Sequence, residues 1–380
     1  MNSTAPIPAA RVSRETAVGI LFDLVATKSL TGQEDDAVAV FVEHAAAIGF
    51  DAHTDEVGNG IASRQGEGPV TLDIALVGHI DTVPGDIPVR IEDNILHGRG
   101  SVDAKGPLCA FLVGAAEADL PPGVRVRVAA ALGEEEDSPG AQHLRDTWRP
   151  DACFIGEPSG WNGVTLGYKG RLVVEVEVTT PSGHSAGEDR SAPDIALAWW
   201  RDAMVLLDRL NADRETTFDT FDSIHATITG MGSESDGLTD RARMTCSFRV
   251  PEWITPEGLG PELRALCRGD ERIALRLGGF EPAHRSDRND ACVRALTAAV
   301  RGEGARPHPK LKTGTCDMNV VARTWRCPIA AYGPGDSGLD HSPVEHLDLD
   351  EYARSIRVVR GAVERLAREM LETRGLGASA

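Results

Sequence analysis

The chain has 380 residues, of which 41% are hydrophobic, and a formal net charge of −19 at pH 7. A chain of this length is too long to fold around one simple hydrophobic core, so two domains are expected. The acidic balance argues against a nucleic-acid partner, and the chain contains no run of about 18 apolar residues that would predict a membrane span. Seven cysteines without a C-x-x-C motif predict reduced thiols in a cytoplasmic protein.

The N-terminal part of the chain alternates predicted helices and strands. After an Ala- and Pro-rich segment that ends at Arg14, helices are expected over 15–26, 35–48 and 106–116. Apolar runs predict strands over 51–56, 60–63, 71–77, 124–132 and 152–155. Such alternation is typical of an α/β domain with a mostly parallel sheet flanked by helices.

Residues 170–280 follow another pattern. The predicted elements are, in order, strand 172–179, helix 193–210, strands 223–229 and 243–250, helix 256–267 and strand 272–277. This β-α-β-β-α-β order is that of a ferredoxin-like module. A helix over 287–300 then resumes the first pattern. We therefore expect a catalytic domain in two parts (1–168 and 283–380) and an inserted lid and dimerisation domain (169–282).

Potential metal ligands occur where several predicted strands end. His79-Ile80-Asp81 follows the strand 71–77 directly, at the strand end where α/β sheets bind ligands. An imidazole can bind a metal while a carboxylate orients its ring, although His-x-Asp alone is a weak signal and is more often part of an exposed polar loop. Further clusters strengthen the metal interpretation: Gly98–Gly106 with Asp103, Gly133–Asp137 with Glu134, Glu135 and Glu136, Gly156–Ser159 with Glu157, and Asp340–Pro343 with His341.

The order of these motifs resembles that of the di-zinc amidohydrolases, which include aminoacylases, carboxypeptidase G-type enzymes, acetylornithine deacetylases and succinyl-diaminopimelate desuccinylases. The resemblance extends from about Ser29 to Leu366. The chain is most similar to the branch of the family that releases lysine or ornithine from an amino-group carrier protein. The stretches that carry this similarity are GHIDTVPG, GRGSVDAKGPL, GEPSGWNGVTLGYKGRL and KTGTCDMNVV. The resemblance implies a zinc-exopeptidase-like catalytic domain with two Zn²⁺ per chain, for which Co²⁺ can substitute.

The resemblance also implies which residues hold the ions. It assigns His79, Asp103 and Glu157 to one zinc, and Asp103, Glu135 and His341 to the other. Two cations about 3.5 Å apart repel each other and need a shared ligand, which is the role implied for Asp103.

Two features near these ligands are expected. In the family the peptide bond after the bridging aspartate is often cis, which here is Asp103–Ala104. Asp81 is expected to assist catalysis by accepting a hydrogen bond from His79, which fixes the tautomer of the ring. The alternative for Asp81 is a simple turn cap.

The run Glu134-Glu135-Glu136 leaves the catalytic base open between two registers. One carboxylate must take a proton from the attacking water and pass it to the leaving amine, while its neighbour binds metal. Many relatives read Asp-Glu-Glu, which would make Glu135 the base and Glu136 the ligand. The spacing to Ser138-Pro139-Gly140 favours Glu134 as base and Glu135 as ligand, with Glu136 in solvent.

The resemblance implies further residues that contact substrate. His184 corresponds to a histidine that a partner subunit's lid supplies to stabilise the oxyanion, which implies a homodimer through the lid; the alternative is an exposed loop histidine. Arg249, Thr315 and Asp317 resemble substrate-binding positions, although Arg249 could equally form a surface ion pair.

The implied substrate is a small acidic carrier protein whose C-terminal Glu is amide-linked to lysine, ornithine or a related diamino acid. A deacylase of small N-acyl amino acids is the alternative, and a non-catalytic relative is disfavoured because the ligands and the base are all present. An acidic carrier would be attracted by a local basic cluster, here Arg301, Arg306, Lys310 and Lys312.

A serine hydrolase is a distant alternative. Gly183-His184-Ser185-Ala186-Gly187 matches G-x-S-x-G, which requires a sharp strand-to-helix turn. The next predicted helix begins only near Pro193, and this interpretation leaves the carboxylate clusters unexplained.

Overall fold

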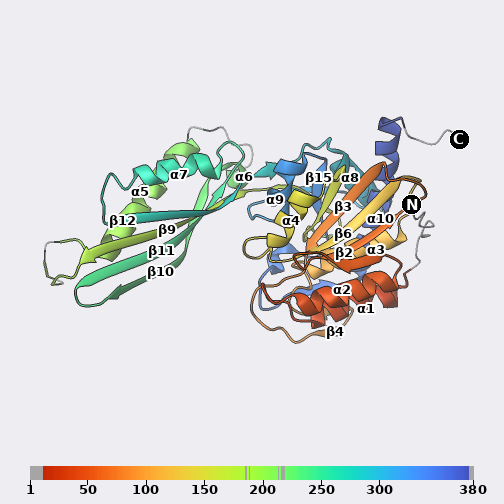
Figure 1. Cartoon of the computed structure of the whole chain (residues 1–380), viewed down its shortest axis with the longest axis horizontal. Coiled ribbons are helices and arrows are strands. Elements are labelled where there is room, and N and C mark those ends of the chain that lie inside the picture. Colours follow the sequence, from red (N-terminus) through yellow and green to blue (C-terminus); the bar gives the residue numbers. More distant parts are fainter. Residues whose placement is uncertain (1–11, 185, 188, 213, 215–218, 376–380) are drawn as a thin grey trace. The chain divides into compact units, whose positions relative to one another are not determined.

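The computed structural model describes residues 12–375 except 185, 188, 213 and 215–218 (Figure 1). The described residues form two compact units. The first comprises the described parts of Met1–Gly167, Ser286–Leu311 and Cys316–Ala380, and the second those of Tyr168–Arg285 and Lys312–Thr315. None of the helices in these ranges combines the length and apolar character that crossing a membrane requires.

A mixed sheet forms the centre of the first unit, in the order β1-β2-β6-β3-β7-β15-β8, with β14 paired to β8. Its strands are β1 (Asp51–Thr54), β2 (Gly60–Gln65), β3 (Leu72–His79), β6 (Val124–Ala131), β7 (Ala152–Gly156), β8 (Gly163–Tyr168), β14 (His308–Lys312) and β15 (Ile329–Tyr332). The short strand β13 (His284–Arg285) lies within the second unit. The central strands β6, β3, β7 and β15 are parallel, which confirms the predicted mostly parallel core. The pairs β1-β2, β2-β6 and β15-β8 are antiparallel.

Helices cover the sheet of the first unit (Figure 1). They are α1 (Arg14–Ala26), α2 (Asp35–Ala47), α3 (Lys105–Glu117), α4 (Pro139–Thr147), α8 (Ala291–Gly302), α9 (Asp317–Trp325) and α10 (Leu349–Thr373), with a 3-10 turn over Ser337–Leu339. All eight residues of β3 are buried, because a central parallel strand has packing on both faces. Gly114 of α3 allows α10 to pack closely, since a Cβ there would lie 2.7 Å from Val359.

A small three-stranded sheet also belongs to the first unit. It consists of β4 (Arg90–Glu92), β5 (Ile95–His97) and β16 (His346–Asp348), in the order β16-β5-β4. Asp93 and Asn94 both have positive φ, at 49° and 65°, as a tight hairpin turn requires. The pairing of β5 with β16 brings residues 95–97 beside residues 346–348, which positions two loops of the candidate site.

The second unit has a four-stranded antiparallel sheet in the order β10-β11-β9-β12. Its elements are β9 (Gly170–Pro181), α5 (Ala192–Ala212), α6 (Asp219–Asp222), β10 (His225–Ser235), β11 (Thr239–Val250), α7 (Pro256–Ala265) and β12 (Ile273–Glu281). Alternate residues of β9, such as Val174 and Val176, pack in one core with Trp199 and Leu206 of α5. This alternation is typical of a sheet covered by helices on one face.

Candidate metal and catalytic site

Three parallel strands of the first unit end beside one another, and each is followed by predicted site residues. His79 is the last residue of β3, Glu134 lies three residues beyond β6, and Glu157 follows β7 directly. Because β3 pairs in parallel with both β6 and β7, their carboxyl ends share one edge of the sheet, which is the usual ligand-binding edge of an α/β fold.

Asp103 lies between two histidines. Its Oδ1 is 3.1 Å from Nε2 of His79, and its Oδ2 is 3.1 Å from Nε2 of His341. Nε2 of His341 also lies 3.0 Å from a carboxylate oxygen of Glu135. One largely buried carboxylate thus presents a separate oxygen to each imidazole.

The imidazoles are held among carboxylates. Burial lowers the pKa of His79, but its contacts with Asp103 and Asp81 outweigh burial and raise that pKa well above the usual value. Hydrogen bonds to Asp103 and Glu135 raise the pKa of His341 to about 10. His341 also has a left-handed φ of 58°, a conformation that is uncommon outside glycine and occurs preferentially at functional sites.

The loop that carries Asp103 depends on glycine. Gly100 has a φ of 83°, and a Cβ on Gly106 would lie 2.3 Å from the carbonyl oxygen of Ser101. The peptide bond Asp103–Ala104 is cis, as the resemblance implied. The glycines therefore allow the chain to turn tightly around the aspartate.

Asp81 connects the His79 ring to the glutamate loop. Nδ1 of His79 lies 3.1 Å from the carbonyl oxygen of Asp81 and 3.4 Å from its carboxylate. The same buried carboxylate accepts hydrogen bonds from the backbone N–H groups of Glu134 (3.1 Å) and Glu135 (3.2 Å) and from the Thr31 hydroxyl (2.8 Å). Asp81 therefore combines contact with the histidine and capping of a loop, the two alternatives that the sequence left open.

The three consecutive glutamates have different environments. Burial raises the pKa of Glu134 well above its usual value, and the nearby carboxylates of Glu157 and Asp317 raise it further, although His79 opposes them. Glu135 faces His341, whereas Glu136 is exposed.

The donor atoms fit a divalent metal. One ligand atom from each of His79, Asp103 and Glu135 can be chosen so that all lie within 4.8 Å of one another. That group does not include Glu157, which is buried close enough to influence the pKa of Glu134. Imidazole nitrogens with carboxylate oxygens are ligands that zinc and similar ions accept.

The predicted substrate residues lie in both units. Within the second unit, Nη1 of Arg249 donates a 2.8 Å hydrogen bond to the hydroxyl of Thr315. Asp317 begins α9 in the first unit, where burial raises its pKa to about 7. His184 is exposed in a loop of the second unit, and its Nδ1 accepts a hydrogen bond from the Ala186 N–H. Ser185 of the G-x-S-x-G match lies outside the described residues.

Sequence reasoning missed several residues that support the site. Thr31 holds Asp81, and Glu345 accepts hydrogen bonds from the loop of Asp103 while pairing with Arg99. Arg99 lies within the motif GRGSVDAKGPL and could have been singled out there. No local pattern marked Glu345, because its partners are more than 240 positions away in the chain.

Comparisons with known proteins agree with this architecture. A family model described as peptidase family M20/M25/M40 matches residues 75–365. The LysW-lysine hydrolase of Deinococcus radiodurans is 44% identical over 368 residues, which cover 95% of this chain and 99% of that protein. The putative LysW-lysine/LysW-ornithine hydrolase of Thermococcus kodakarensis is 39% identical over 366 residues, covering 94% and 96%.

Solved structures show the same fold at low sequence identity. The M20 family metallo-carboxypeptidase Sso-CP2 of Sulfolobus solfataricus superposes with a TM-score of 0.75 at 17% identity, covering 92% of this chain and 99% of that one. The YXEP protein of Bacillus subtilis, described as a dinuclear metal binding peptidase from the M20 family, has a TM-score of 0.68 at 15% identity, covering 95% and 99%. By its family match and its close relatives, the chain belongs to peptidase family M20/M25/M40.

Proposed function

We propose that this chain is a di-zinc amidohydrolase that releases lysine, ornithine or a related diamino acid from the C-terminal Glu of an amino-group carrier protein. The observation that carries the catalytic part is Asp103, whose two oxygens each face one histidine at 3.1 Å. The relatives from Deinococcus radiodurans and Thermococcus kodakarensis are named as hydrolases of LysW-lysine or LysW-ornithine, and these names support a substrate in which lysine or ornithine is attached to the LysW carrier protein.

The metal ligands in this proposal are two sets that share Asp103. His79 and Glu157 complete one set, and Glu135 and His341 complete the other. Bound zinc, or cobalt in its place, would polarise the scissile carbonyl and lower the pKa of water. Asp81 would hold the His79 ring and the loop of Glu134 and Glu135 in fixed positions relative to each other, because its carboxylate contacts both.

Glu134 is the proposed proton carrier. Its raised pKa suits a group that takes a proton from the attacking water and then gives it to the leaving amine. The contact between Glu135 and His341 favours Glu135 as a ligand and leaves Glu134 for this role. The exposure of Glu136 argues against the register in which Glu136 binds metal.

Arg249, Thr315 and Asp317 are the proposed substrate contacts. The guanidinium of Arg249 is suited to a carboxylate, since it presents several fixed donors. Thr315 accepts one of its hydrogen bonds and so orients it. The buried carboxylate of Asp317 is suited to a cationic amino group of the released amino acid.

The substrate is tested by comparing two kinds of amide. A carrier protein conjugated to lysine through its C-terminal Glu should be cleaved with a kcat/KM at least about 100-fold above that for N-acetyl-lysine or N-acetyl-ornithine, because carrier contacts worth about 2.7 kcal/mol would add to recognition. Release of free lysine is measured by amino-acid analysis, with chelator-treated enzyme as the control. Faster cleavage of the acetyl amino acids would instead establish the small-molecule deacylase.

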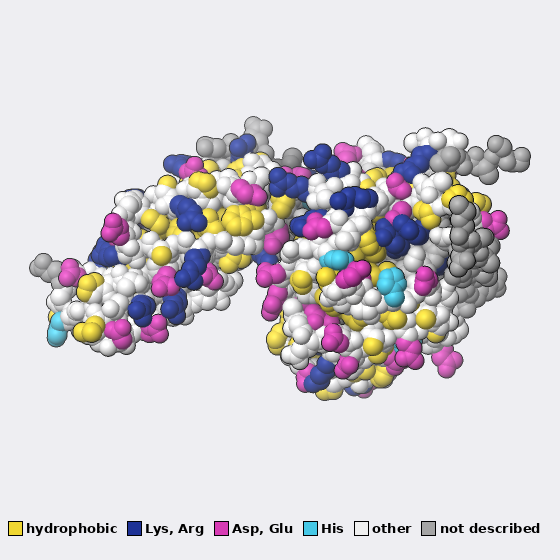
Figure 2. Space-filling model, viewed as in Figure 1, with side chains coloured by type: hydrophobic (Ala, Val, Ile, Leu, Met, Phe, Trp, Pro, Cys, Tyr) yellow, Lys and Arg dark blue, Asp and Glu magenta, His cyan; other side chains and the backbone are white. Residues whose placement is uncertain are grey.

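The distribution of charge is compatible with a carrier as partner. The chain is acidic overall, yet Lys and Arg side chains are interspersed with Asp and Glu on the face shown in Figure 2. Of the predicted basic cluster, Arg301 and Arg306 are exposed in the first unit. An acidic carrier would be attracted by such a local cluster.

The second unit is the proposed ferredoxin-like lid and dimerisation domain. Its sheet order β10-β11-β9-β12, with α5 and α7 between strands, supports the ferredoxin-like assignment. Strand β10 lies at the edge of the sheet, and nearly all of its residues are exposed. An exposed edge strand can pair with its twofold mate and form an isologous dimer contact. The dimer would let His184 of one chain serve the catalytic site of the other.

Subunit mixing tests His184. His184→Ala and Glu134→Gln should each be inactive as homodimers. A fully exchanged 1:1 mixture should recover about a quarter of the wild-type activity, because about half of the dimers are then heterodimers and one of the two pockets in each carries neither lesion. Activity is measured after subunit exchange has been verified by native mass spectrometry. Heterodimers without activity would show that His184 does not act across the dimer.

A cytoplasmic location is also proposed. All seven cysteines are free thiols, and burial raises the pKa of several of them, including Cys153 and Cys292. Free thiols without a disulfide are typical of a reducing compartment.

A further inference from the structure

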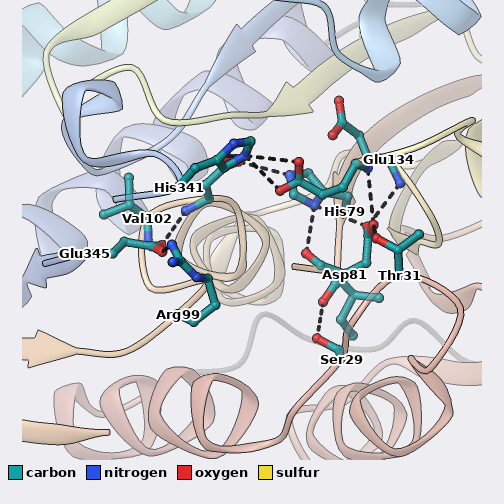
Figure 3. A network of polar contacts seen from close by, with 12 residues as sticks. Ser29, Thr31, His79, Asp81, Arg99, Val102, Glu134, His341 and Glu345 are labelled. Carbon is teal, nitrogen blue, oxygen red and sulfur yellow. Dashed lines mark hydrogen bonds and ion pairs between the residues drawn. The ribbon is translucent and has the colours of Figure 1, made fainter. Parts of the chain in front are cut away.

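A buried ion pair lies directly behind the Asp103 loop. The side chains of Arg99 and Glu345 point toward each other (Figure 3). Nη1 of Arg99 is 2.7 Å from Oε2 of Glu345, and the two side chains are 13% and 0% exposed. Nε of Arg99 also donates to the carbonyl oxygen of Gly85 at 3.2 Å. A carboxylate as buried as Glu345 requires such a partner, since an unpaired buried charge is strongly destabilising.

The second oxygen of Glu345 holds the loop of the bridging carboxylate. Oε1 accepts hydrogen bonds from the backbone N–H groups of Val102 at 2.8 Å and Asp103 at 3.1 Å. Hydrogen bonds to an ionised acceptor are stronger than neutral ones. Glu345 thus uses one oxygen for the cation and the other for the backbone of Asp103.

Glu345 also belongs to the segment that carries the other proposed ligand. It lies four residues after His341 and immediately before β16, which pairs with β5. The carbonyl oxygen of Glu345 accepts a 3.4 Å hydrogen bond from Gly98, at the start of the Asp103 loop. Through one residue, the loops of Asp103 and His341 are therefore attached to each other.

We propose that Glu345 is a positioning residue for the metal centre and that Arg99 holds its carboxylate in place. This inference rests on the proposed di-metal site. If Asp103 bridges both ions, a shift of its loop weakens the binding of both, whereas loss of a ligand such as His79 affects mainly one. Groups that orient metal ligands typically change metal affinity by about 10- to 100-fold when removed.

The test measures metal affinity without substrate. The full-length chain is stripped of metal, and Zn²⁺ binding is followed by competition with a chromophoric chelator in Glu345→Gln, Arg99→Met and Arg99→Lys. In the first two variants both binding steps should weaken by about 10- to 100-fold. Arg99→Lys keeps the cation and should bind Zn²⁺ with intermediate affinity. The two Arg99 variants therefore test the proposal even if Glu345→Gln fails to fold.

A second buried ion pair provides a matched control. Asp73 pairs with Arg125 and Arg127; the side chains of Asp73 and Arg127 are 9% and 13% exposed. Asp73 lies in β3 but six residues before His79, away from the strand end that carries the site. Asp73→Asn should lower the unfolding temperature of the metal-free chain and leave both zinc affinities unchanged.

The outcomes separate the two proposals. If Arg99→Met and folded Glu345→Gln keep the wild-type zinc affinity and only unfold at a lower temperature, as expected for Asp73→Asn, then the ion pair between Arg99 and Glu345 is merely structural. A wild-type chain that binds fewer than two zinc ions would overturn the di-metal centre, and with it this inference. Weakening of one binding step alone would also contradict a role exerted through the shared Asp103.

Discussion

Glu134→Gln should keep both metal ions and lose at least about three decades of turnover. Glutamine has nearly the same shape as glutamate, so the hydrogen bond from the Glu134 backbone to Asp81 should persist. Its amide cannot take a proton from the attacking water or return it to the leaving amine. Turnover is measured on the carrier conjugate, and metal content by elemental mass spectrometry on the same preparation.

The neighbouring glutamates are the controls for this experiment. Glu135→Gln should lose metal, because the Glu135 carboxylate faces His341 in the proposed site. Glu136→Gln should behave like the wild type, since Glu136 is exposed. An active Glu134→Gln together with an inactive Glu135→Gln that retains both ions would shift the register by one and make Glu135 the base.

His79→Ala and His341→Ala should each bind about one zinc ion fewer than the wild type, and Asp103→Ala should bind neither ion tightly. Each histidine faces a different oxygen of Asp103, so each should serve a different ion, whereas the shared aspartate should serve both. Loss of either ion should abolish turnover. Zinc content is measured after dialysis against metal-free buffer, together with circular dichroism to show that each variant is folded.

A second cluster of potential ligands provides the control. His143 lies 3.4 Å from Glu56 and 3.8 Å from Asp55, on the surface of the first unit. The carboxylate of Asp55 is engaged by the backbone N–H groups of residues 57–59, which makes it a turn cap. His143→Ala should therefore retain both zinc ions. Retention of both ions in His79→Ala or in His341→Ala would refute the ligand assignment.

Much of the fold could be predicted from local patterns. The apolar run from Leu72 to Val77 predicted a strand, and β3 (Leu72–His79) lies there and is buried throughout. The helix expected over 287–300 begins instead at Ala291, because the Asp290 side chain accepts hydrogen bonds from the first turn. The strand expected over 223–229 continues as β10 to Ser235, since pairing with β11 compensates for the glycines at 230 and 232.

Short strands and sheet edges could not be predicted in this way. Strands β4, β5 and β16 have three residues each, too few for a periodicity to emerge. β5 and β16 are paired across about 250 positions of chain, so neither contains the information that the other is its partner. The strands expected over 51–56 and 60–63 are present as β1 and β2, but composition did not specify that β1 pairs antiparallel with β2, or that β2 pairs antiparallel with β6.

For the candidate site, the sequence by itself determined the chemistry available. Histidine and carboxylate clusters at strand ends, in the order of a known family, were sufficient to predict a di-metal hydrolase and to identify candidate ligands. Only the tertiary structure decided which of these side chains meet. It placed Asp103 between His79 and His341, set Glu135 rather than Glu136 against His341, and brought Glu345 to the loop of Asp103. The physical reason is that parallel strands and distant loops converge through long-range packing, whereas local patterns describe only neighbours in the chain.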